Sequence, residues 1–417
     1  MSITRTQLEA AADALRLTLQ FDRAADGVLH DFFGARRALG ARDRAFVADA
    51  VYGVLRRKRT VDHLSPGGEP RQLLLAYLTR VAGLSVRELA SLVGPEEQAW
   101  LNRVKAVSLE ALPPAVRTDL PDWVFDRLSA RLAGVETMAV ARGLNQPAPL
   151  DLRVNTLKAQ RQAVLEELAA GGIDGTPTPH SPVGIRVKGR PAINRHALFA
   201  NGTIEVQDEG SQLLGYLVAP RRHELVVDFC AGAGGKSLML GALMRSQGRL
   251  YAFDTSAARL ARLQPRLRRS GLSNVHPHPI ANENDIRVKR LAGKADRVLV
   301  DAPCSGLGTL RRNPDLKWRQ SPQSVAELQV KQAAILRSAA TLLKPGGRLI
   351  YATCSFLPEE NEEVVAGFLG EHPDFRQMNV GELLKQQGMT PDTGENLRLW
   401  PHLHGTDGFF AAVVTLT

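Results

Sequence analysis

The stretch LVVDFCAGAGGKSLML, residues 225–240, decides the fold that we predict for this chain. An apolar run is followed by a glycine-containing turn and then by a segment with apolar residues at helical spacing. Similar apolar runs recur at 249–253, 297–300 and 348–351, with helical segments between them. This alternation is typical of a parallel sheet covered on both faces. We therefore predict a Rossmann-like, doubly wound α/β domain over 207–417, whose ligands bind beyond the carboxyl ends of the strands.

Two smaller regions precede this domain. Apolar residues recur at helical spacing over 7–21, 44–55 and 72–84, so residues 1–120 are predicted to form an all-α domain. The segments LDLRVN, GIRVK and GTIEVQ resemble strands, and a helix is expected over 160–170. Residues 121–206 are therefore predicted to form a small α+β module. A chain of 417 residues is long enough for three such domains.

Composition limits the partners and the compartment. The net charge of +10 favours a polyanion such as RNA, because Lys and Arg set against phosphates release condensed counterions. We see no apolar run of membrane-spanning length and no signal peptide, so we expect a cytoplasmic protein, monomeric and without membrane contact. The three cysteines are far apart and form no C-x-x-C pair, so neither a disulfide framework nor a metal site is expected.

The glycine-containing turn fits several cofactors. A P-loop needs G-x-x-x-x-G-K-[ST], and Gly235-Lys236-Ser237 agrees with it, but Cys230 stands at the first glycine position. A dinucleotide-binding turn needs G-x-G-x-x-G, and its third glycine falls on Ser237. Both patterns are thus incomplete. A plain tight turn without a ligand is a further alternative.

An acidic residue favours a third cofactor. The next apolar run ends in Asp254, about 20 residues beyond the glycines, where a carboxylate can accept hydrogen bonds from both hydroxyls of a ribose. S-adenosylmethionine has a ribose but no pyrophosphate, so it suits this turn. We therefore expect S-adenosylmethionine to contact Asp254 and the turn, which consists of Cys230, Ala231, Gly232, Ala233, Gly234, Gly235 and Lys236.

Two thiols follow two other predicted strands. Cys304 stands in DAPCSG after one apolar run, and Cys354 stands in TCS after the next. Because sequential parallel strands are often neighbours, both sulfurs are expected at the same cleft as the cofactor. Buried packing is the alternative for each of them, and for Cys230 it is the one we favour.

A thiol beside a methyl donor indicates methylation of carbon 5 of a pyrimidine. That carbon is barely nucleophilic, but addition of a thiolate to carbon 6 makes the ring an enamine that attacks through carbon 5. Asp301 and Lys236 are candidates to contact the base edge and to balance charge, although a simple ion pair is an equal alternative. The base must be unstacked to reach such a pocket, which favours a flipped or single-stranded nucleotide.

These motifs resemble a known family, the RNA cytosine-5 methyltransferases of the Sun/RsmB type. The resemblance covers roughly residues 120–417. The N-terminal segment ARDRAFVADAVYGVLRRKR resembles the NusB-like domain that some bacterial members carry. The matching segments are DLRVNTLK (151–158), IEVQDEGSQLL (204–214), DFCAGAGGKS (228–237), DAPCSGLGTLRRNPDLKW (301–318), LKPGGRLIYATCSFLPEENEEVV (343–365) and HGTDGFFAAVV (404–414).

The resemblance implies a role for each thiol. Cys354 would be the nucleophile, and Cys304 would assist release of the methylated product. It also implies cofactor contacts from Cys230 to Lys236, at Asp254 and at Asp301, and a further contact after the third strand. Asn282 aligns with that last position, with Asp285 as an alternative.

RNA is the implied substrate, and 16S ribosomal RNA is our interpretation. Arg153, Arg311 and Arg312 are candidate RNA contacts, the last two because they follow Cys304 closely. A tRNA methyltransferase and a non-catalytic, rRNA-binding assembly factor are the alternatives. A dinucleotide-dependent oxidoreductase is disfavoured, because it leaves both cysteines unexplained.

Overall fold

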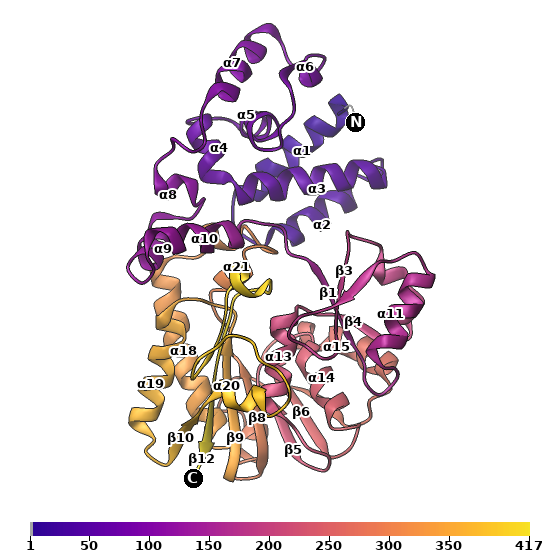
Figure 1. Ribbon diagram of the computed structural model, residues 1–417, viewed down its shortest axis with the longest axis vertical. Coiled ribbons are helices and arrows are strands. Elements are labelled where there is room, and N and C mark those ends of the chain that lie inside the picture. Colours follow the sequence, from indigo (N-terminus) through magenta and orange to yellow (C-terminus); the bar gives the residue numbers. More distant parts are fainter. Residues whose placement is uncertain (1–2) are drawn as a thin grey trace. The chain divides into compact units, whose positions relative to one another are not determined.

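The computed structural model describes residues 3–417 and divides into two compact units (Figure 1). The helical unit comprises Met1–Pro147 and Thr309–Pro322, and the α/β unit comprises Ala148–Gly308 and Gln323–Thr417. Within the described range, no helix is both long enough and apolar enough to cross a bilayer.

Short helices form the helical unit, as predicted from the periodicity. Thr4 begins the first of them, since its hydroxyl accepts a hydrogen bond from the amide of Gln7 while the Gln7 side chain accepts one from the amide of Thr4. The elements are α1 (Arg5–Thr18), α2 (Ala25–Ala35), α3 (Ala41–Arg56), α4 (Lys58–Leu64), α5 (Pro70–Ala76), the π-helical turn η1 (Tyr77–Val81), α6 (Val86–Leu89), α7 (Pro95–Ala106), α8 (Pro114–Arg117), α9 (Asp122–Ser129), α10 (Gly134–Leu144) and α17 (Leu316–Arg319).

The limits of this unit differ from the predicted domain boundary. Helices continue past residue 120 to Leu144, and Thr309–Pro322 joins them although it lies far along the chain. Lys317 makes this connection, because its ammonium donates to the carbonyl of Arg56 and to the side chain of Asn145. The indole of Trp318 also donates to the carbonyl of Leu55. These contacts are long-range, so local sequence patterns could not predict them.

The predicted α+β module lies at the start of the α/β unit. Four antiparallel strands pair in the order β2-β3-β1-β4, and they enclose a small apolar core with α11 (Arg161–Ala170). The strands are β1 (Leu150–Val154), β2 (Gly175–Pro177), β3 (Gly184–Val187) and β4 (Ile204–Val206), and the short helices are η2 (Ile193–Arg195) and α12 (Ala197–Ala200).

The main sheet confirms the predicted Rossmann-like, doubly wound class. Its strands run in the order β10-β12-β9-β8-β5-β6-β7, and β11 pairs with β12. The five strands from β9 to β7 are parallel, whereas β12 is antiparallel to β9, β10 and β11. The strands are β5 (Leu225–Asp228), β6 (Arg249–Asp254), β7 (Val275–Pro279), β8 (Ala295–Asp301), β9 (Leu343–Thr353), β10 (Phe375–Met378), β11 (Leu397–Leu399) and β12 (Phe409–Leu416).

The strand order reverses between β5 and β8. The chain runs from β5 through β6 to β7 on one side, and from β8 to β9 on the other. Ligands of doubly wound sheets bind at such a reversal, beyond the carboxyl ends of the strands. The glycine turn follows β5 and the first cysteine motif follows β8, so both flank this point.

Helices cover both faces of the sheet (Figure 1). One layer contains α13 (Glu209–Val218), α14 (Gly235–Leu243), α15 (Ala257–Ser270) and α20 (Val380–Lys385). The other contains α16 (Ile286–Lys289), α18 (Pro322–Ala340) and α19 (Glu362–Glu371). The remaining short helices are η3 (Leu307–Thr309), η4 (Pro358–Glu360) and α21 (Pro401–His404).

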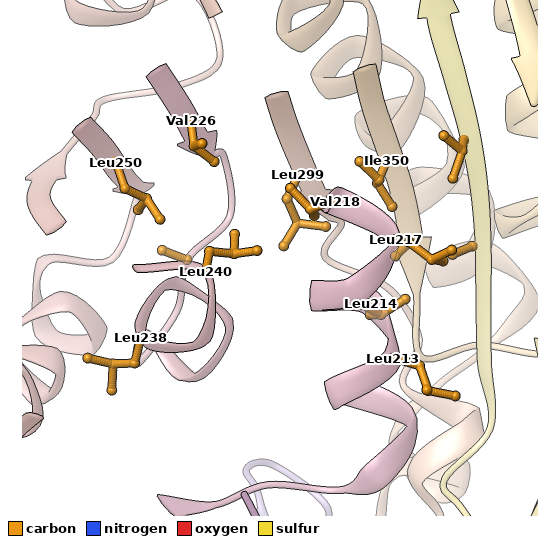
Figure 2. Packing of buried hydrophobic residues seen from close by; sticks show 14 of the residues in the cluster. Leu213, Leu214, Leu217, Val218, Val226, Leu238, Leu240, Leu250, Leu299 and Ile350 are labelled. Carbon is orange, nitrogen blue, oxygen red and sulfur yellow. The ribbon is translucent and has the colours of Figure 1, made fainter. Parts of the chain in front are cut away.

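Leucines of α13 hold this helix against the sheet. Figure 2 shows Leu217 and Val218 near Leu299 of β8 and Ile350 of β9, and all four side chains are fully buried. A buried leucine contributes roughly 1.5–3 kcal/mol relative to an exposed one. The packing therefore fixes the strands whose ends carry the cysteines.

Candidate active site

The glycine turn between β5 and α14 forms one wall of a cavity of about 830 Å³. The turn is held by the amide of Ala231, which donates to the carbonyl of Phe253. Gly234 has a φ of 79°, and a Cβ there would lie 2.2 Å from Leu263. A glycine is therefore required at this point for the backbone to pass α15.

Asp254 faces the turn from the end of β6. Its Oδ2 accepts a hydrogen bond from the amide of Gly232 at 2.8 Å, and its Oδ1 accepts from the amide of Ser256 and from the guanidinium of Arg259. The side chain is only 2% exposed. Asp254, which we predicted to bind a ribose, thus lines the cavity next to the glycine turn.

Lys236 and Asp301 form the ion pair that was one of the two predicted alternatives. The ammonium lies 2.6 Å from Oδ2 of Asp301, and both side chains line the cavity. Burial by itself would lower the pKa of Lys236, but the charge and hydrogen bond of Asp301 outweigh burial and raise it. The lysine therefore remains a cation inside the cavity, beside the cysteines.

The two predicted thiols meet at the same edge of the sheet. β8 and β9 are parallel neighbours, with Asp301 opposite Ala352, so the residues after both strands lie side by side. The sulfurs of Cys304 and Cys354 are 3.4 Å apart, and both residues line the cavity. The cleft therefore contains two thiols next to the glycine turn, as predicted.

The second cysteine loop is fixed by close backbone packing. The amide of Gly308 donates to the carbonyl of Cys354 at 2.9 Å, and the amide of Gly408 donates to the carbonyl of Gly308. A Cβ on Gly308 would lie 2.2 Å from the carbonyl oxygen of Gly408. The glycine in this motif thus allows three segments to converge behind the sulfurs.

Cys230 lies in the glycine turn, apart from the pair of thiols. It packs against the apolar cluster between the sheet and α18, the role that we favoured, and it also lines the cavity, where the resemblance implied a cofactor contact. Burial, and then the nearby carboxylates of Asp228 and Asp301, raise the pKa of its thiol. Cys230 is therefore unsuited to act as a thiolate.

Asp228 is a site residue that sequence reasoning missed. It is 1% exposed, lines the cavity, and accepts a hydrogen bond from the Ser237 hydroxyl at Oδ2. No donor among residues 3–417 reaches its buried Oδ1. Burial raises its pKa to about 7, and the hydroxyl of Ser237 opposes that rise. The available signal was its place as the last residue of β5, at the ligand-binding edge.

The cavity distinguishes the two candidates after β7. Asn282 lines it together with Glu283, whereas Asp285 is absent from its wall. Asp285 instead caps α16 by accepting hydrogen bonds from the amides of Ala281 and Arg287. The geometry therefore favours Asn282 as the residue available to a ligand.

The predicted RNA contacts need correction. Arg153 is 3% exposed, and its guanidinium donates to Gln207 and to the carbonyl of Gly235. Arg311 is 5% exposed within the helical unit, and Arg312 is half-buried. Both Arg153 and Arg311 are buried, so the structure places neither guanidinium at a surface where it could reach a phosphate, and an RNA contact of Arg312 stays a prediction. Arg153 instead supports the glycine turn from behind.

Comparison with known proteins identifies the family. The family described as 16S rRNA methyltransferase RsmB/F matches residues 215–415, and its ferredoxin-like domain matches residues 120–194. A probable ribosomal RNA small subunit methyltransferase B from Synechocystis sp. is 35% identical over 90% of this chain and 92% of its own. Ribosomal RNA small subunit methyltransferase B from Salmonella typhi is 30% identical over 96% of both chains.

Solved structures share the fold. The crystal structure of the protein PH0851 has a TM-score of 0.81 at 27% identity, covering 100% of this chain and 99% of its own. A methyltransferase homologue from Pyrococcus horikoshii has a TM-score of 0.63 at 29% identity, covering 75% of this chain and 100% of its own.

The fold, the cavity and these relatives together define an RNA methyltransferase. More closely, the chain belongs to the RsmB/F family of 16S rRNA methyltransferases. This agrees with the resemblance drawn from the sequence motifs.

Proposed function

We propose that this protein methylates carbon 5 of a cytosine in 16S ribosomal RNA, with S-adenosylmethionine as methyl donor and Cys354 as nucleophile. The observation that carries this proposal is the pair of thiols 3.4 Å apart on the cavity that also contains the glycine turn. A methyltransferase that acts on a nitrogen or an oxygen has no need of these two thiols.

The residues of the cavity fit this cofactor. The carboxylate of Asp254 would accept hydrogen bonds from the ribose hydroxyls, in place of the bond it now accepts from Arg259. The free Oδ1 of Asp228 would accept one from the ammonium group of the methionine portion. Asn282 would contact the adenine edge. When bound, the cofactor supplies a methyl group on a positively charged sulfur.

Two cysteine side chains of the protein then react with the base or assist its release. The thiolate of Cys354 forms a bond to carbon 6 of the cytosine, and carbon 5 becomes nucleophilic and accepts the methyl group. A base takes the proton on carbon 5, and the electron pair left behind forms the carbon 5–carbon 6 double bond and expels the sulfur of Cys354, which releases 5-methylcytosine and restores the thiolate. We assign assistance of this release to Cys304, which lies against Cys354.

Asp301 and Lys236 support the addition step. Asp301 lines the cavity beside Cys304 and would accept a hydrogen bond from the cytosine edge. Lys236 keeps its positive charge through Asp301 and stabilises the negative charge that develops on the ring in a site with little water.

Opposite effects of two cysteine substitutions test the mechanism. With 16S ribosomal RNA and S-adenosylmethionine, Cys354→Ala is expected to abolish methyl transfer, because no sulfur remains to attack carbon 6. Cys304→Ala is expected to accumulate a covalent protein–RNA adduct, visible as a shifted band on a denaturing gel. A Cys354→Ala protein that still transfers methyl groups contradicts the proposal.

Bisulfite sequencing of total RNA, from cells with and without the protein, identifies the substrate. We expect cells without the protein to lose a 5-methylcytosine signal in 16S ribosomal RNA and in no other RNA. A loss in tRNA alone would contradict 16S ribosomal RNA as the substrate and indicate tRNA instead. Calorimetric titration with S-adenosylmethionine separates the enzyme from an assembly factor, which would bind no cofactor.

A further inference from the structure

Two neighbouring residues, Glu360 and Asn361, are buried behind the cysteines and have no part in the mechanism above. Their exposed fractions are 0% and 2%. They stand where η4 ends and α19 is about to begin. A buried carboxylate is costly unless hydrogen bonds compensate its lost hydration, so the contacts of Glu360 need an explanation.

Glu360 supports the loop that carries Cys304. Its Oε1 accepts hydrogen bonds from the amide of Ser305 at 2.7 Å and from the side chain of Gln332 at 3.0 Å, and its Oε2 accepts from the Ser305 hydroxyl at 2.5 Å. The amide group of Gln332 also donates to the carbonyl of Pro303. The residues on both sides of Cys304 are therefore fixed to one carboxylate.

Asn361 supports the loop that carries Cys354 in the same manner. Its Oδ1 accepts a hydrogen bond from the hydroxyl of Thr353 at 2.5 Å, and its Nδ2 donates to the carbonyl of Ser355 at 3.0 Å. The hydroxyl oxygens of Ser305 and Ser355 lie 3.2 Å apart and join the two loops. The supports are thus alike in geometry and differ in charge, with an acid behind one thiol and an amide behind the other.

We propose that this difference in charge, Glu360 behind Cys304 and Asn361 behind Cys354, decides which of the two thiols is the thiolate. The inference rests on the proposed function, since it explains how two adjacent cysteines acquire separate roles. A buried negative charge disfavours a second one nearby, because the low polarity of the interior screens their repulsion weakly. On this proposal Cys304 keeps its proton, which leaves Cys354 as the attacking sulfur.

The surroundings of Cys304 agree with this assignment. Its hydrogen bond with Cys354, its burial, and the negative charges of Cys354, Glu360 and Asp301 all raise the pKa of the Cys304 thiol. A protonated Cys304 at 3.4 Å can donate its S–H to the sulfur of Cys354, which stabilises a thiolate there. Glu360 is thus a positioning residue that acts on the reaction through Cys304.

Alkylation of each thiol by iodoacetamide tests the inference in the full-length protein. The rate depends on the thiolate fraction, and mass spectrometry of the peptides separates Cys304 from Cys354 across a pH series. In the unaltered protein, Cys354 is expected to react faster. The assay uses neither RNA nor a methyl donor, so its failure is distinguishable from failure of the proposed methyl transfer.

Two isosteric substitutions should shift the two rates in different ways. Glu360→Gln removes the charge but can still accept hydrogen bonds, and it should raise the Cys304 alkylation rate roughly three- to tenfold, as for a pKa lower by about half to one unit. Asn361→Asp places an acid behind Cys354 and should slow its alkylation by a similar factor. Together the two changes should reverse the preference between the thiols.

A nearby surface acid provides the control. Glu363→Gln, on the exposed side of α19, should leave both alkylation rates unchanged. Thermal unfolding identifies any variant that does not fold, and the two single substitutions test the proposal independently of each other. If folded Glu360→Gln and Asn361→Asp proteins both retain the original ratio of rates and its pH dependence, the proposal is overturned.

Discussion

The buried carboxylates of the two units are satisfied to different degrees. In the helical unit, Asp119 is 0% exposed and accepts hydrogen bonds from the amide and hydroxyl of Thr60 while pairing with Arg57 at 3.0 Å. In the α/β unit, Asp228 is 1% exposed but accepts only from Ser237, and no donor among residues 3–417 reaches Oδ1.

This difference distinguishes a structural charge from one kept for a ligand. Buried polar atoms of folded proteins nearly always have partners, so an exception needs a reason. Both carboxylate oxygens of Asp119 already have donors, whereas Oδ1 of Asp228 is open to a cation that enters the cavity. The unpaired oxygen costs stability in the free protein, and a bound ammonium group would recover that cost.

The largest effect is expected from Asp119→Ala. Removal of this carboxylate leaves the charge of Arg57 uncompensated, which should destabilise the helical unit by about 3–5 kcal/mol. Hydrogen exchange over α3 and α4, followed by mass spectrometry, measures the loss in that unit alone. Asp122→Ala is the matched control, because Asp122 forms an exposed ion pair with Arg59 and should cost at most about 1 kcal/mol. Equal protection in both variants contradicts the structural role.

The second effect concerns the cation of the cavity. Lys236→Met keeps the length of the side chain but removes its charge, and methyl transfer should fall roughly 10²–10³-fold in kcat, as when one electrostatic contact to a transition state is lost. Single-turnover kinetics with 16S ribosomal RNA measures the change. Lys188→Met, on an exposed loop, should retain full activity. A kcat within twofold of the unaltered protein would show that the ion pair with Asp301 is only structural.

Asp228→Asn should have a smaller effect, and it should weaken cofactor binding while it stabilises the free protein. Loss of a hydrogen bond to a charged group costs about 1.5–3 kcal/mol, so S-adenosylmethionine should bind roughly 10–150-fold more weakly. The pKa of Asp228 is about 7, so the affinity of the unaltered protein should increase as pH rises through that value and the carboxylate ionises.

The stability of the free protein should change in the reverse direction. A carboxyl whose pKa is raised on folding makes the protein less stable as pH rises from its ordinary pKa toward about 7, because the unfolded chain ionises over that range while the native carboxyl keeps its proton. Asp228→Asn should remove this loss and raise the melting temperature at neutral pH. Calorimetric titration and thermal unfolding across pH measure the two quantities, and a pH-independent affinity would argue against the ammonium contact.

The smallest effect is expected from Lys317→Met. Burial lowers the pKa of Lys317 to about 7, so this lysine is held by the carbonyl of Arg56 and by Asn145 with little benefit from its charge. A well-packed apolar side chain of similar volume is often neutral or stabilising at such a site. A change of at most about 1 kcal/mol is expected by hydrogen exchange over α3. A loss as large as that of Asp119→Ala would show that the lysine is required as an ion.

The sequence predicted those parts of the fold that depend on local pattern. Continuous apolar runs gave β5, β6, β8 and β9, because strands of a parallel sheet are buried on both faces. The meeting of Cys304 and Cys354 was also predictable, since it needs only that two successive parallel strands be neighbours. The glycine turn and Asp254 were predicted on the same basis.

The remaining features depend on contacts between distant residues. Arg153 and Arg311 are cations like any other in the sequence, and only the folded chain shows that both are buried. Asp228 and Glu360 are carboxylates whose roles depend on which donors surround them. No periodic pattern in the sequence indicates that Thr309–Pro322 belongs to the helical unit, because this association depends on single side chains such as Lys317.

The discontinuity of the helical unit has a consequence for biosynthesis. Met1–Pro147 emerges from the ribosome long before Thr309–Pro322, which completes the same unit. About 160 residues separate the two parts, and at 5–20 residues per second their synthesis takes on the order of 10–30 s. During that interval Asn145 lacks Lys317, and the carbonyl groups of Leu55 and Arg56 lack their later donors. The helical unit is therefore completed only after the strand that leads to Cys304 has been made.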